Sequence, residues 1–111
     1  MPSLSTTQLQ KMQSDYDAQY WDHDGFSTFE NIRHLTLHVG KLAGKLAAYC
    51  EAKEHARALP EDQITEEVIP DLLGYALQLS NWLDQDLSNL YANRLKANER
   101  RFEKKAHVDN T

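Results

Sequence analysis

The fold is decided by one continuous stretch, residues 27–57, which reads STFENIRHLTLHVGKLAGKLAAYCEAKEHAR. Ser27 followed by Glu30 is the pattern of a capping box, and Pro60 sets a limit beyond which a helix would not continue. The apolar residues between these two signals recur at steps of three and four: Ile32, Leu35, Val39, Leu42, Leu46 and Tyr49. This spacing predicts a long helix with a seam for another helix.

A second stripe of mostly small residues lies beside that seam and consists of Leu37, Gly40, Gly44 and Ala47. A glycine in a helix interior costs about 1 kcal/mol relative to alanine. Two glycines four residues apart therefore predict the close approach of another helix.

Three further helices are expected on either side of this segment. The first covers residues 5–20 and is weakly amphipathic. The third follows Thr65 as N-cap, and Pro70 near its first turn predicts that the helix either kinks there or begins there. Asp86 is expected to cap the fourth, which ends near Lys105 within a frayed tail, residues 103–111.

The chain is thus expected to be all-α, a bundle of about four helices in a single domain, residues 1–111. An N-terminal helix or arm, residues 1–27, precedes a core of residues 28–102. With 111 residues, 4 glycines and 3 prolines, the composition suits a small helical domain. Both central helices are apolar on more than one face, and we expect a homodimer that buries the excess through them.

Charge and composition exclude several classes of protein. The net charge of −5 argues against a nucleic-acid partner. No apolar run suggests a signal peptide or a membrane span, and the single cysteine, Cys50, is expected in the core, so a cytoplasmic location is the expectation. The charge is uneven, because residues 1–30 carry a net −4 and residues 94–105 a net +4.

Two polar stripes run beside the apolar seams. The first is basic and consists of His34, His38, Lys41 and Lys45, and the second consists of Glu67, Asp71, Gly74 and Gln78. Antiparallel packing of the two helices would bring Lys41 or Lys45 near Asp71, either as an ion-pair network or as a polar pocket. The histidine pair is also spaced for a metal ion, while Trp21 and Trp82 are expected to be packing residues.

Three segments in order resemble the MazG-like all-α nucleoside triphosphate pyrophosphohydrolases, over residues 28–102. Residues 37–42, LHVGKL, resemble the family's Glu-Glu-x-Gly-Glu-Leu signature, and residues 66–75, EEVIPDLLGY, its Glu-x-x-Asp signature with the following Tyr. The closing pattern of the family is matched by Asp86-Leu87, Arg94-Leu95, Asn98, Arg101 and Phe102.

The resemblance implies a Mg²⁺ site built from carboxylates, and most of these are replaced here. The acidic positions of the first signature hold Leu37, His38 and Lys41, and the Glu position of the second holds Val68. Asp71 remains, with Glu67 one residue away from its expected place. Mg²⁺ needs oxygen ligands, and lysines at the site would repel it.

We therefore expect a non-hydrolytic family member, a nucleotide- or phosphate-binding or regulatory homodimer that needs no cofactor. Its predicted ligand-binding residues are His38, Lys41, Lys45, Arg94, Asn98 and Arg101. An alternative is an active, Mg²⁺-dependent pyrophosphohydrolase with a shifted site, in which Asp71 and Glu67 would be catalytic and Asp71 a metal ligand. A second alternative is a purely structural dimerisation module.

Overall fold

Helices form almost the whole described structure. The computed structural model describes residues 3–21 and 25–109, and for residues 106–109 it describes the backbone. The elements are α1 (Thr6–Tyr20), α2 (Thr28–Glu54), a π-helical turn η1 (Ile64–Val68), α3 (Ile69–Trp82) and α4 (Leu87–Asp109). The described residues contain no strand, so the predicted all-α class and number of helices are confirmed.

The helix starts follow the capping residues. Ser27 Oγ accepts a hydrogen bond from the Glu30 backbone at 3.1 Å and Glu30 reaches back to the Ser27 backbone, which is the predicted capping box of α2. Ser5 and Gln8 form a second capping box at the start of α1. Asp86 Oδ1 accepts from the Asn89 backbone at 3.2 Å, as expected for α4.

The third helix begins differently from the prediction. Thr65 does not cap it, and its hydroxyl instead donates to the Asp62 carbonyl at 3.2 Å. A π turn precedes α3, and Pro70 lies in the first turn of the α-helix. Proline has no N–H to donate to the preceding turn, so the regular α-helical pattern starts at Pro70's own turn. Helical backbone already runs from residue 62 through the π turn, so Pro70 marks the start of the regular α-helix α3 and not the start of helical structure.

Two helix ends also differ from the prediction. α2 ends at Glu54 rather than near Arg57, and Ala56 adopts a left-handed conformation with φ of 55° where the chain turns back. Tyr49 donates its hydroxyl to Glu61 at 2.9 Å, which ties the end of α2 to the loop that follows. α4 extends past Lys105 to Asp109, through part of the predicted tail.

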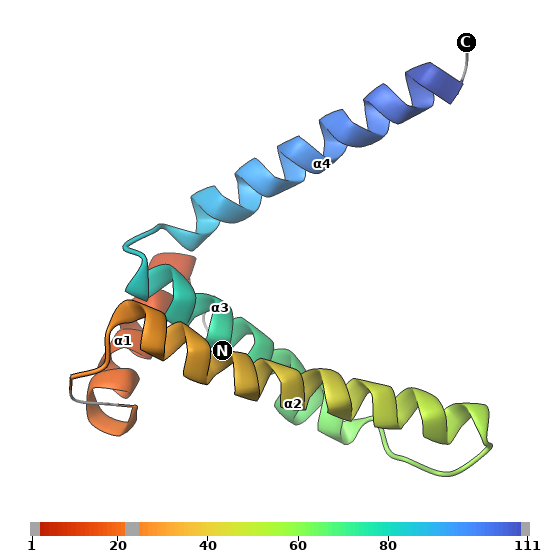
Figure 1. Cartoon of the computed structure of the whole chain (residues 1–111), viewed down its shortest axis with the longest axis horizontal. Helices are drawn as coiled ribbons and strands as arrows, with labels where there is room; N and C mark the ends of the chain where they lie inside the picture. Colours follow the sequence, from red (N-terminus) through yellow and green to blue (C-terminus); the bar gives the residue numbers. More distant parts are fainter. Residues whose placement is uncertain (1–2, 22–24, 110–111) are drawn as a thin grey trace.

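The small core lies where α2 packs along α3 and the π turn (Figure 1). Its buried apolar residues are Leu35, Leu42, Val68 and Leu77. Other seam residues of α2, Val39 and Leu46, are both 37% exposed, because the single chain offers only one partner face. Cys50 is exposed, so its predicted place in the core is wrong.

Within the described ranges, no other helix of the chain makes the predicted close approach at the glycine stripe. A Cβ built at Gly40 or Gly44 would meet nothing within 4 Å. Leu37, beside them, is 66% exposed. The stripe is therefore an open face of α2.

α4 extends away from the rest of the molecule (Figure 1). Among the described residues, its hydrogen bonds to the rest of the chain lie at its start, where the Leu87 backbone donates to Gln10 Oε1 at 3.0 Å and Ser88 donates to Thr6 at 2.6 Å. The radius of gyration is 18.0 Å, against about 13 Å for a compact domain of this length. A single chain is thus open in shape.

Candidate functional site

The basic stripe lies on one face of α2, as its spacing predicted. His34 and His38 stand one turn apart with their Nε2 atoms 3.2 Å from each other. The Trp21 ring, at the end of α1, packs edge-on to both imidazoles at 5.4 Å between ring centroids. Burial lowers the pKa of His38 below 6.5, and the neighbouring His34 and Lys41 lower it further. His38 is therefore mainly neutral at pH 7.

Lys45 continues the stripe and forms an ion pair with Glu67 in the π turn. The hydrogen bond from Lys45 lowers the pKa of Glu67, which keeps this carboxylate ionised at neutral pH. The sequence placed Lys41 or Lys45 near Asp71, whereas the ion pair seen in the described residues joins Lys45 to Glu67, one turn before Asp71. Lys41, by contrast, is exposed and forms no ion pair with any residue in the described ranges.

The predicted residues of α4 lie apart from this stripe within one chain. α4 contacts α1 and α3, and no contact joins it to α2 in the described structure. Arg101 lies over the ring of its neighbour Phe102, at 5.7 Å from the centroid, and Asn98 is half-buried along α4. One chain therefore brings together His38, Lys41 and Lys45 but leaves Arg94, Asn98 and Arg101 on a separate helix.

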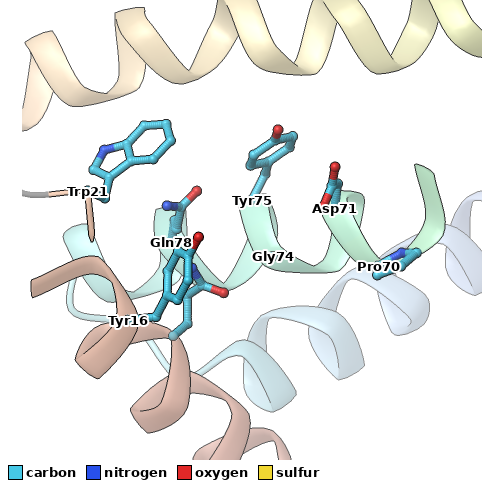
Figure 2. A pocket seen from close by; sticks show the side chains of 8 residues that line it. Tyr16, Trp21, Pro70, Asp71, Gly74, Tyr75 and Gln78 are labelled. Carbon is cyan, nitrogen blue, oxygen red and sulfur yellow. The ribbon is translucent and has the colours of Figure 1, made fainter. Parts of the chain in front are cut away.

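A cleft of about 300 Å³ opens between α1 and α3. Figure 2 shows Trp21, Tyr75 and Asp71 projecting from its walls towards α2, which runs along the top of the view. The remaining acidic signature residue, Asp71, thus lies in a cleft with aromatic walls. The lining residues are Gln13, Tyr16, Trp21, Pro70, Asp71, Gly74, Tyr75 and Gln78.

A polar network forms the inner end of this cleft. Asp17 Oδ1 accepts one hydrogen bond from Gln13 Nε2 and one from Gln78 Nε2, each at 2.9 Å. Gln78 is only 2% exposed, and its Oε1 has no hydrogen-bond partner among the residues that the structure describes. Because a buried carbonyl without a partner is costly, this atom marks a place where the cleft lacks a donor.

Tyr75 links the cleft to the basic stripe. Its ring lies 6.2 Å from the His38 ring, and the hydroxyl end points towards α2 (Figure 2). Burial raises the pKa of Tyr75, and the nearby Asp71 carboxylate raises it further. The phenol is therefore protonated at neutral pH and offers both a donor and an acceptor.

Three residues of the second polar stripe, Asp71, Gly74 and Gln78, line this cleft, so the spacing in the sequence indicated part of it. The contribution of α1 was missed. Trp21 does pack on Trp82, at 6.2 Å between centroids, as expected, but it also forms a wall of the cleft. Gln13, Asp17 and Trp21 recur at four-residue steps, so they lie on one face of α1 and of the residue that caps it. This spacing was the signal that could have predicted a wall of the cleft on α1.

The carboxylates near the stripe are few and partly engaged. Glu67 is held by Lys45, which leaves Asp71 as the acid of the α1–α3 cleft wall. Among residues 3–21 and 25–109, no three His, Cys, Asp or Glu side chains are grouped so that they could hold a metal ion. The arrangement is suited to binding a polar, planar molecule by hydrogen bonds and ring contacts.

No family model, curated protein or solved structure that was compared with the chain matches it. None of the helices in the described part of the chain is long and apolar enough to cross a membrane.

Proposed function

We propose that this chain is a non-hydrolytic, MazG-like nucleotide-binding protein that acts as a homodimer. The observation that carries the proposal is the Lys45–Glu67 ion pair beside Asp71. In the family that the sequence resembles, carboxylates at this place would hold Mg²⁺. Here the Lys45 ammonium lies at this place and pairs with Glu67, one of the two remaining acids. A positive charge at that position disfavours the binding of a divalent cation.

The cleft and the stripe together offer groups for the two ends of a nucleotide. Trp21 and Tyr75 present aromatic rings at the cleft, where a base would pack. Lys41, exposed on α2 and without an ion-pair partner among the described residues, supplies a cation for a phosphate. A ligand with a planar head and an anionic tail fits this arrangement better than a metal complex does.

The dimer is supported by the apolar surface that one chain leaves open. A groove between α3 and α4, about 450 Å³ in volume, is lined by Leu73, Ala76, Leu87 and Tyr91 together with Thr6 and Ser88. Beyond it, α4 exposes Leu95 by 49% and Phe102 by 63%. Exposed apolar surface of this extent is typical of an interface, and a second copy would supply the Arg94, Asn98 and Arg101 that one chain keeps away from α2.

Calorimetric titration with a nucleoside triphosphate, with and without Mg²⁺, tests the ligand. We expect binding that does not require Mg²⁺, and no release of pyrophosphate. Lys41→Ala should weaken binding, whereas Lys53→Ala, an exposed lysine near the end of the same helix, should leave it unchanged. Mg²⁺-dependent pyrophosphate release that Asp71→Asn abolishes would instead establish the hydrolase alternative.

Sedimentation at micromolar concentration tests the dimer. The wild type should sediment as a dimer, and Tyr91→Glu should shift it towards the monomer because Tyr91 lies in the apolar groove. A stable dimer that binds no nucleotide under any condition would favour the structural dimerisation module. A monomeric wild type would refute the homodimer.

A further inference from the structure

We infer that the α1–α3 cleft selects a base that carries an exocyclic amino group, as cytosine and adenine do, over the corresponding keto base. The inference rests on the proposed function, because it specifies which nucleotide the same site takes. The deciding atom is Gln78 Oε1, at the inner end of the cleft.

The orientation of the Gln78 amide is fixed by its neighbour. Its Nε2 donates to Asp17 Oδ1 at 2.9 Å. The Asp17 oxygen is the acceptor in this bond, so a flipped amide would place two acceptors against each other. The amide nitrogen therefore stays on Asp17, and the oxygen faces the other way.

Gln13 is oriented by the same carboxylate. Its Nε2 also donates to Asp17 Oδ1, at 2.9 Å, and its Oε1 lies next to Gly74, where it would be 3.6 Å from an added Cβ. Two amide nitrogens are thus turned inward to Asp17, and the Gln13 oxygen lies on the cleft floor. A third acceptor, the Asp71 carboxylate, stands at the other end of the cleft (Figure 2).

The inner end of the cleft therefore presents acceptors, Gln78 Oε1 and Gln13 Oε1, and a ligand with N–H donors at that position fits it best, while the Tyr75 hydroxyl points away from it towards α2. An amino group on a flat heterocycle supplies such donors in the plane of the ring, while Trp21 and Tyr75 pack against the ring itself. A keto group at the same position would set a carbonyl oxygen against Gln78 Oε1 and leave both without a donor.

The ligand must reach an atom just below the surface. Gln78 Oε1 has less than 1 Å² of exposed area, and Figure 2 shows it between Trp21 and Tyr75. We expect a rotation of Trp21 or Tyr75 to open this position, since side-chain rotations commonly accompany binding. Binding of the amino base should therefore change the fluorescence of Trp21.

The test compares matched pairs of monophosphates by calorimetric titration: cytidine against uridine, and adenosine against inosine. Within each pair, the amino compound should bind roughly tenfold more tightly. In Gln78→Met, which keeps the length of the side chain but lacks the acceptor, this preference should disappear. Gln19→Met, an exposed residue of α1, is the matched control and should keep it.

A second variant guards against loss of folding in Gln78→Met. Gly74→Ala adds a methyl group to the cleft floor, with its nearest neighbour at an ordinary contact distance of 3.6 Å. Alanine also favours a helix over glycine, so this variant should be at least as stable as the wild type. It should nevertheless bind the amino nucleotides several-fold more weakly, because the cleft is narrower.

The outcomes separate this inference from the proposed function. Equal affinity for the two members of each pair would overturn the selection of an amino base and leave nucleotide binding in place. If no nucleotide binds but the nucleoside cytidine does so in a Gln78-dependent way, the base site stands and the proposed function fails. If cytidine does not bind either, both fail.

Discussion

Lys45 in the middle of α2 and Glu67 in the π turn before α3 form an ion pair across the helix interface. The pair joins α2 to the π turn close to the buried Leu42 and Val68, on the same two elements. It also occupies one of the two acids that the resemblance to a metal-dependent family would assign to the site.

Replacing Glu67 by glutamine should destabilise the protein at neutral pH and have little effect in acid. The Lys45 hydrogen bond lowers the pKa of Glu67 below 4.5, so the folded state binds fewer protons than the unfolded state in that range. The stabilisation is thus present above pH 4.5 and is lost as the pH falls through the lowered value. Urea unfolding of both proteins between pH 3 and 7 measures this. Glu66→Gln, an exposed neighbour, should show no such dependence, and a constant difference between wild type and Glu67→Gln would contradict the assignment.

His38 should make the protein less stable as the pH drops below 6.5. Its pKa is lowered by burial and by His34 and Lys41, so the unfolded state takes up a proton before the folded state does. The contribution of neutral His38 to the free energy of unfolding is fully present above pH 6.5, and it declines as the pH falls towards the lowered pKa. In His38→Gln this part of the decline should vanish, whereas His55→Gln, at the exposed end of α2, should retain it. Nuclear magnetic resonance titration of the imidazole would measure the pKa directly, and a value above 6.5 would refute the prediction.

Truncating the core at Leu42 should cost about 2–5 kcal/mol of unfolding free energy. The side chain of Leu42, on α2, is only 2% exposed. Leu42→Ala therefore leaves a cavity in a core that has few other buried residues. Leu4→Ala makes the same chemical change at a residue that is 48% exposed, and its effect should stay within about 0.5 kcal/mol. Chemical denaturation of the two variants gives both values, and equal losses would mean that the core is misplaced.

Removing the cap of α2 should cost about 1 kcal/mol. Ser27 Oγ accepts the hydrogen bond of the Glu30 backbone, and in Ser27→Ala that amide loses its partner. Ser14→Ala, at an exposed position inside α1, tests the same substitution where no cap exists. Thermal unfolding should show a lower midpoint for Ser27→Ala alone, and similar midpoints for the two variants would speak against the capping box.

The helices were predictable where the sequence carries local signals. Ser5, Ser27 and Asp86 each hold a side-chain oxygen at a helix start, and that chemistry can be read without knowing the fold. The π turn was not predictable from Thr65, because a threonine before two glutamates has the pattern of a cap whether or not its hydroxyl finds a nearer partner. The missed end of α2 has a similar origin, since nothing local favours Glu54 over Arg57.

The site was predictable only for the part that lies on one helix. Periodicity placed Asp71, Gly74 and Gln78 on one face of α3, and the structure has them on one wall of the cleft. The other wall comes from α1, whose Asp17 lies 61 residues before Gln78 in the chain and whose apolar pattern is weak. No local signal specifies such a distant pairing, and the same holds for the separation of α4 from α2.

The protrusion of α4 has a consequence for how local stability is distributed. Beyond Tyr91 this helix has little of its own chain to pack against, and helices held mainly by their own backbone bonds are marginal in water (Figure 1). In a lone chain its amides should therefore exchange with deuterium far faster than those of α2 around Leu35 and Leu42. The deuterium exchange rate of the α4 amides therefore reports whether a second copy or another partner packs against this helix.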